Sequence, residues 1–167
     1  MALSDAQKQF IKDAGVAAKA SQISTGVPAS VIIAQAILES GWGKSHMGAA
    51  NNYFGIKAFE KNGVVDFGPV ATGFVDRNTK EFDKHGNAFF VVAHFRAYKD
   101  MAGSFTDHGL FLKNGPRYAG AMAACAKNKD ASEFAKGLQQ AGYATDPAYA
   151  VKLISIMTKN DLFKFNV

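Results

Sequence analysis

The chain has 167 residues, of which 48% are hydrophobic and 20% charged, as in an ordinary globular protein with one sizeable core. Nineteen Lys and Arg against fourteen Asp and Glu give a formal net charge of +5, which favours attraction to polyanions without selecting one. No apolar run reaches the roughly 18 residues of a membrane span, and Cys125, the single cysteine, excludes an intrachain disulfide and a cysteine-based zinc site.

Two helices are expected before residue 42. Ser4 and Gln7 form a capping-box pattern that predicts a first helix to about Lys19. Pro28 suits the first turn of a second helix, and Gly41 suits its left-handed end. The segment between them is apolar around most of its circumference, so it is expected to be buried.

A small β segment is expected next. Glycine, asparagine and alternating apolar residues dominate residues 51–98, with strand patterns at 64–67 and 88–95 and a turn at 84–87 after 79–82. The sequence predicts two or three strands as an insertion at about 58–97 of a single domain, 1–167.

Helical patterns then return and continue to the end. Asp146 or Thr145 is expected to cap the last helix with Pro147 at its first position, and Cys125 is expected to pack as a small buried residue. The fold class is α+β and mostly helical. The four expected helices span 101–112, 118–127, 131–140 and 147–158.

Glu39 falls in the last turn of the second helix, where a carboxylate gains nothing from the helix dipole. Desolvation by the apolar helix and the dipole both favour the protonated carboxyl. A protonated carboxyl near neutral pH is what a general acid requires. The alternative is that Glu39 pairs with an arginine or caps a backbone amide.

Other chemistries fit the sequence poorly. The segment GWGKS (41–45) lacks the earlier glycine of a phosphate loop, because Leu38 occupies that position, and it follows a helix rather than a strand. The four histidines have no metal-ligand spacing, so no metal is expected.

Five motifs recur in the same order in one known family. They are AQAILESGWG (34–43), NNYFGIK (51–57), TKEF (79–82), FRAY (95–98) and GYATDPAYA (142–150). The chain resembles the FlgJ-type bacterial peptidoglycan N-acetylglucosaminidases of glycoside hydrolase family 73 over about residues 20–158. The resemblance implies a lysozyme-like fold, in which a helical lobe faces a β-hairpin lobe across a sugar-binding cleft.

The same resemblance assigns catalytic residues. It implies that Glu39 protonates the departing glycosidic oxygen and that Glu81 is the second carboxylate, as base or nucleophile. The tyrosine usual after that glutamate is Phe82 here. Tyr143 matches a tyrosine that orients water or the acetamido group of the substrate. Each of the last two also suits a plainer role, Glu81 as a solvated strand residue and Tyr143 as a packing residue.

Sugar contacts are expected from the other motif residues, although Trp42 and Phe54 suit the core equally well. Arg96 and Tyr98 are expected to support the cleft. The expected substrate-binding residues are Trp42, Asn52, Tyr53, Phe54 and Tyr149.

The resemblance therefore predicts a cofactor-free hydrolase that cleaves the β-1,4 bond between N-acetylglucosamine and N-acetylmuramic acid. Muramidase or lytic transglycosylase activity, and a non-catalytic glycan-binding module, remain alternatives. A monomer is expected. Nucleic-acid binding is not expected, because acidic residues are interleaved with the basic ones and leave no basic stripe. The first residues show no secretory signal. A phage lysin, or an antibacterial toxin delivered to the periplasm or cell wall by another route and blocked by an immunity protein in its cleft, would fit.

Overall fold

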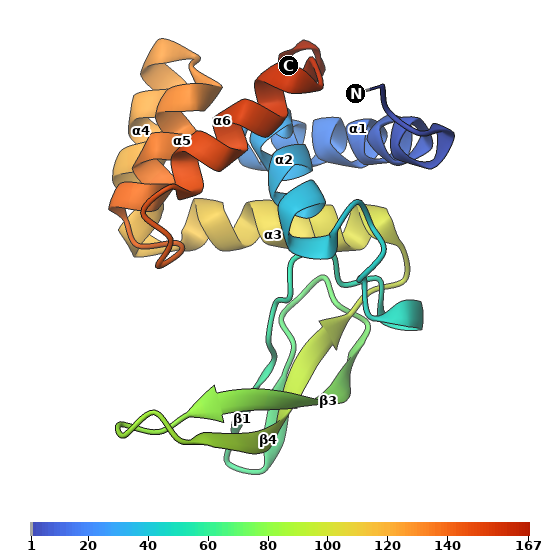
Figure 1. Ribbon diagram of the computed structural model, residues 1–167, viewed down its shortest axis with the longest axis vertical. Helices are drawn as coiled ribbons and strands as arrows, with labels where there is room; N and C mark the ends of the chain where they lie inside the picture. Colours follow the sequence, from blue (N-terminus) through green and yellow to red (C-terminus); the bar gives the residue numbers. More distant parts are fainter. Residues whose placement is uncertain (1) are drawn as a thin grey trace.

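The computed structural model describes residues 2–167 and consists of a helical lobe with a β lobe projecting from one end (Figure 1). None of the described helices is both long and apolar enough to cross a membrane. The α-helices are α1 (Asp5–Thr25), α2 (Ala29–Ser40), α3 (Met101–Asn114), α4 (Ala119–Asn128), α5 (Ala131–Gln140) and α6 (Tyr149–Lys159).

Helix α1 starts with the predicted capping box. The Ser4 hydroxyl accepts a hydrogen bond from the backbone N–H of Gln7, whose side chain accepts one from Ser4. The helix runs six residues beyond the predicted Lys19, because its last turns pack on α3. There the Ser21 hydroxyl donates to the carbonyl of Phe105, and a Cβ added at Gly109 would lie 2.4 Å from the Ser21 oxygen.

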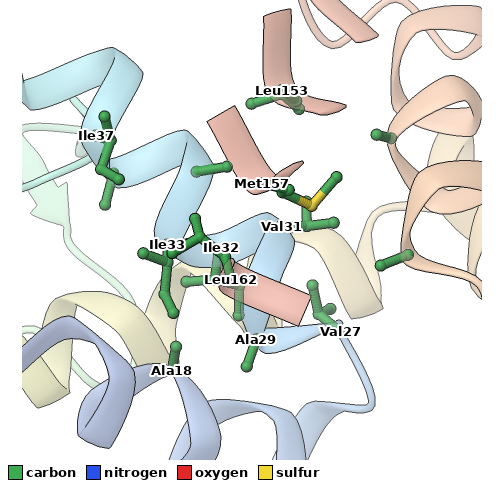
Figure 2. Close-up of a cluster of buried hydrophobic side chains, with 14 of the residues drawn as sticks. Ala18, Val27, Ala29, Val31, Ile32, Ile33, Ile37, Leu153, Met157 and Leu162 are labelled. Carbon is green, nitrogen blue, oxygen red and sulfur yellow. The ribbon is translucent and has the colours of Figure 1, made fainter. Parts of the chain in front are cut away.

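Helix α2 forms the centre of the core. Its residues are buried from Ala29 to Ile37, and Gly41 ends it in the left-handed conformation, with φ of 56°. This agrees with the expected buried helix, although Pro28 is its N-cap rather than its first residue. Figure 2 shows the apolar side chains gathered around α2. Those contributed by other segments include Ala18, Leu153, Met157 and Leu162.

The β lobe contains four strands in two antiparallel hairpins, where two or three strands were expected. A short hairpin pairs β1 (Phe59–Lys61) with β2 (Val64–Asp66), and a longer one pairs β3 (Gly73–Phe82) with β4 (Ala88–Ala97). The carboxylate of Asp83 closes the turn by accepting from the backbone of residues 85 and 87.

A buried ion pair attaches the β lobe to α3. The carboxylate of Asp107 accepts from the Arg96 guanidinium at 2.8 Å and from the Tyr98 hydroxyl at 2.6 Å. The amide of Asn52 donates to the carbonyls of Ile56 and Arg96, both at 2.9 Å. Arg96 and Tyr98 thus support the junction of the two lobes, as the sequence predicted.

The start of the last helix differs from the prediction. Helix α6 begins at Tyr149, two residues after Pro147. The Asp146 carboxylate caps the preceding turn, accepting from the backbone N–H of Ala148, and it also bonds Lys152. Asp146 therefore stabilises the turn that leads into α6. Cys125 is buried in α4, as expected.

Candidate active site

Glu39 lies where α2 ends, at the junction between the lobes. It lines two cavities, one of about 440 Å³ and one of about 460 Å³, which both also touch Gly55. A carboxyl between two such cavities can reach the bond that joins units bound on either side of it. The arrangement therefore suits cleavage within a chain.

The electrostatics of Glu39 agree with its expected protonation. Its residue surface is open to solvent, yet the surrounding protein atoms desolvate the carboxyl and raise the pKa of Glu39 above its ordinary value of 4.5. The carboxyl also stands at a helix C-terminus, where the dipole disfavours negative charge. Glu39 is therefore the acidic side chain of the cleft best suited to hold a proton.

Tyr143 shares the first of these cavities with Glu39. Burial raises the pKa of Tyr143 well above its ordinary value, with further contributions from Tyr149 and from the charge of Glu39. Its hydroxyl is thus a neutral hydrogen-bond donor near the Glu39 carboxyl. Tyr143 thus lines the same cavity as Glu39, where the role implied by the family resemblance would place it.

Behind Tyr143 lies a group of buried polar side chains. The amide of Gln35 donates to the Tyr149 hydroxyl at 2.9 Å, and its oxygen lies 2.8 Å from Nε2 of His108. The Tyr149 ring stacks on that of Tyr143 with the ring centroids 5.4 Å apart. Burial lowers the pKa of His108 to about 3, so its imidazole is neutral.

Sequence analysis did not single out Gln35 or His108 as site residues. Gln35 carried a usable signal, because it is a polar residue in an apolar buried helix, four positions and about one turn before Glu39. His108 carried none, since the fold alone brings α3 beside α2.

Two of the expected sugar-binding aromatics line the cavities. Phe54 lines the first cavity, and its ring stacks on His108 with the ring centroids 3.9 Å apart. Tyr53 lines the second and stacks on His46 at 5.1 Å. Both side chains are mostly buried, so each exposes little of its ring to a bound sugar.

The other three expected sugar-binding residues have structural contacts. Trp42, with φ of 63°, packs edge-on against Phe10 and lines neither of the two cavities in the described chain. Asn52 lines the second cavity, but its amide holds the backbone of residue 56 and of β4. Tyr149 is buried beneath Tyr143. Support of the site is therefore the role that their contacts favour.

Glu81 lies on β3, about half exposed, with its carboxylate 3.7 Å from the ammonium of Lys57. Lys57 lines the first cavity, whereas Glu81 lines neither cavity within residues 2–167. Glu81 therefore lies beside the cleft and contacts it through Lys57. Within the same residues, no three His, Cys, Asp or Glu side chains are grouped to hold a metal ion.

A helical lobe that presents a partly desolvated glutamate to a β lobe across a cleft defines a lysozyme-like glycoside hydrolase. Comparison with known proteins supports this class. The profile of the glucosaminidase family, described as mannosyl-glycoprotein endo-beta-N-acetylglucosaminidase, matches residues 15–162. The chain therefore belongs to the glucosaminidase family.

Comparison with individual proteins agrees with this family assignment. The chain is 37% identical to the peptidoglycan hydrolase FlgJ of Salmonella typhimurium over 160 residues, covering 93% of this chain and 46% of FlgJ. It is 36% identical to the exo-glucosaminidase LytG of Bacillus subtilis over 168 residues, covering 97% of this chain and 54% of LytG. The chain thus spans about half the length of the curated relatives it matches.

Among solved structures, the catalytic domain of the autolysin Auto from Listeria monocytogenes superposes with a TM-score of 0.79 at 27% identity. The match covers 99% of this chain and 90% of that domain. The lysozyme-like fold expected from the sequence is confirmed.

Proposed function

We propose that this domain hydrolyses peptidoglycan at the β-1,4 bond between N-acetylglucosamine and N-acetylmuramic acid, with Glu39 as general acid. The observation that carries the proposal is the position of Glu39 between two cavities, with a raised pKa. Family membership and the names of the relatives support the substrate. Lys57, Arg96 and Arg117 line the first cavity and suit a polymer that bears carboxylates.

In this mechanism Glu39 donates its proton to the glycosidic oxygen as the bond breaks. Tyr143 then orients either the attacking water or the substrate acetamido group from the same cavity. Glu81 acts as second carboxylate only if closure of the β lobe brings it from Lys57 toward the sugar. Of the three assigned roles, that of Glu81 has the least support, because Glu81 lines neither cavity in residues 2–167.

A second candidate is a lytic transglycosylase, in which one glutamate serves as acid and base and the product is an anhydro sugar. The placement of Glu81 outside both cavities favours it, because the cleft residues of the described chain then include one carboxylate, Glu39. A non-catalytic glycan-binding module is disfavoured, since simple binding does not require a desolvated carboxyl.

The test is digestion of purified peptidoglycan by the wild type and by Glu39→Gln. The amide is nearly isosteric but cannot donate the proton, so the rate should fall about 10²- to 10⁴-fold with the fold retained. Glu133→Gln, an exposed change on α5, is the matched control. A folded Glu39→Gln enzyme within a few-fold of the wild-type rate would remove Glu39 from its role.

Mass spectrometry of the released fragments identifies the bond. A reducing-end glucosamine supports the proposed activity, whereas reducing-end muramic acid identifies a muramidase and an anhydro product identifies a transglycosylase. We further propose use as a delivered antibacterial effector or a phage lysin, and an immunity protein in the cleft belongs to the first of these. Neighbouring genes would distinguish them, a holin gene for a lysin and a small signal-bearing gene for an effector.

A further inference from the structure

The two cavities beside Glu39 differ in charge. Three cationic side chains line the first cavity, namely Lys57, Arg96 and Arg117. The second is lined by one, Lys44. Glu39 lines both cavities, and desolvation favours its neutral form. The first cavity therefore carries an excess of positive charge from the described residues.

Two of the three cations in the first cavity already have partners. The ammonium of Lys57 lies 3.7 Å from the carboxylate of Glu81, and the guanidinium of Arg96 donates to Asp107 at 2.8 Å. Arg117 is exposed and forms no ion pair with a carboxylate of residues 2–167. Arg117 is therefore the cation of this cavity whose charge the described chain leaves available to a ligand.

The side-chain type at this position suits a carboxylate. A guanidinium is planar, keeps its charge at every working pH, and can donate two parallel hydrogen bonds to the two oxygens of one carboxylate. The chain has two other arginines, and both serve the fold. Arg96 holds Asp107, and Arg77 donates to the backbone carbonyl of Asp76.

Buried neighbours hold the backbone that carries Arg117. It is the middle residue of the short 3₁₀ helix η2 (Pro116–Tyr118), where the N–H of Tyr118 donates to the carbonyl of Gly115 at 2.9 Å. The side chain of Tyr118 is buried, and its ring lies against that of Tyr143 with the centroids 6.1 Å apart. Because Tyr143 shares the first cavity with Glu39, this packing fixes where Arg117 enters the cavity.

We propose that Arg117 is a specificity-determining residue that binds a carboxylate carried by the muramic acid units of the glycan strand. The inference rests on the proposed hydrolysis of peptidoglycan. Muramic acid presents a carboxylate either on its lactyl group, when that group is free, or on the peptide attached to it, whereas N-acetylglucosamine has none. Arg117 thereby favours peptidoglycan over an uncharged polymer with the same β-1,4 linkage.

The first experiment measures KM on three forms of soluble glycan strand. The first form bears peptides, the second has been stripped of peptides by an amidase, and the third is stripped and has its lactyl carboxylates converted to methylamides. Arg117→Gln should raise KM about 10-fold on a form that carries the bound carboxylate, the low end for a hydrogen bond to a charged group because the residue is exposed. On the neutral third form, KM should equal that of the wild type, and kcat should stay within about threefold throughout.

The three forms also identify the carboxylate. A rise in KM on the peptide-bearing form assigns the peptide carboxylate, and a rise on the stripped form assigns the lactyl carboxylate. An equal rise on the charged and neutral forms, or no rise on either charged form, would overturn the proposal.

Two further variants separate a specific contact from general attraction. Lys127→Gln removes one positive charge from an exposed site on α4 that lines neither cavity, so it should leave KM within about twofold on every form. Arg117→Lys keeps the charge without the planar fork and should restore only part of the lost affinity. If Lys127→Gln raises KM as much as Arg117→Gln does, net charge alone acts and Arg117 has no special role.

Binding without turnover separates this proposal from the proposed function. Calorimetry gives the dissociation constants of the same strands for Glu39→Gln and for Glu39→Gln/Arg117→Gln. If the wild type cleaves none of the strands, the proposed function fails, and the two dissociation constants still decide whether Arg117 binds a carboxylate. If the wild type cleaves them while Arg117→Gln changes neither KM nor the dissociation constant on charged strands, the function stands and Arg117 is a solvated surface residue.

Discussion

Replacing Asp107 with asparagine tests how the β lobe is attached. The Asp107 side chain is 4% exposed, that of its partner Arg96 is 18% exposed, and the two are joined at 2.8 Å. The amide would keep the volume of the carboxylate but leave the guanidinium without a counter-charge. Removing one member of a buried ion pair costs about 3–5 kcal/mol. For a chain of this size each kcal/mol lowers Tm by about 2–4 °C, so Asp107→Asn should lower Tm by about 6–20 °C.

The assay is thermal unfolding followed by circular dichroism, with the double variant Arg96→Met/Asp107→Leu as the comparison. Replacing both partners by apolar residues removes the unpaired charge, so the double variant should recover much of the lost stability. A Tm of Asp107→Asn within about 2 °C of the wild type would show that water or a shifted loop already neutralises Arg96. The β lobe would then not depend on a buried ion pair for its attachment.

Three further predictions concern the cleft. Tyr143→Phe should remove about 1–3 kcal/mol of transition-state stabilisation, and so lower kcat, with little change in Tm. A variant that melts early but hydrolyses normally would show that Tyr143 is a packing residue. Glu81→Gln should reduce hydrolysis less than Glu39→Gln if Glu81 only positions water and equally if it is the base, whereas an unchanged rate would exclude both roles. Because burial raises the pKa of Glu39, kcat/KM should fall on the alkaline side at a pH above 4.5. The raised pKa contributes stability that is present below about pH 4.5 and lost as pH rises through the folded value, so Glu39→Gln should melt later than the wild type at neutral pH but not near pH 4.

The helical lobe was largely predictable because its signals are local. Ser4 and Gln7 mark one helix start, and Gly41 marks the end of α2 and therefore the place of Glu39. The predicted start of the last helix at Pro147 was wrong. An aspartate before proline can cap a turn as well as a helix, and the sequence around Asp146 does not distinguish the two. The motif resemblance then supplied the family, which local signals alone do not specify.

The β lobe and the second layer of the site were harder to predict. Strand β1 is short and exposed, so it carries no alternating pattern to detect. The surroundings of Glu81 depend on its contact with Lys57, which is not local in sequence. His108 likewise meets Gln35 across 73 residues, a separation that only the packing of α3 against α2 determines.

The two walls of the cleft differ in stiffness. Glu39 is carried by a helix whose residues 29–37 are all buried, whereas the hairpin of β3 and β4 has solvent on both faces, with the neighbouring side chains Phe89 44% and Phe90 73% exposed. Moving the acid would disrupt close-packed side chains, but bending the hairpin disturbs few. Differences in the shape of a bound substrate would therefore be accommodated by the β3–β4 hairpin rather than by α2. Under the proposed function, a glycan strand held taut in a cross-linked wall would deflect the hairpins while Glu39 keeps its place.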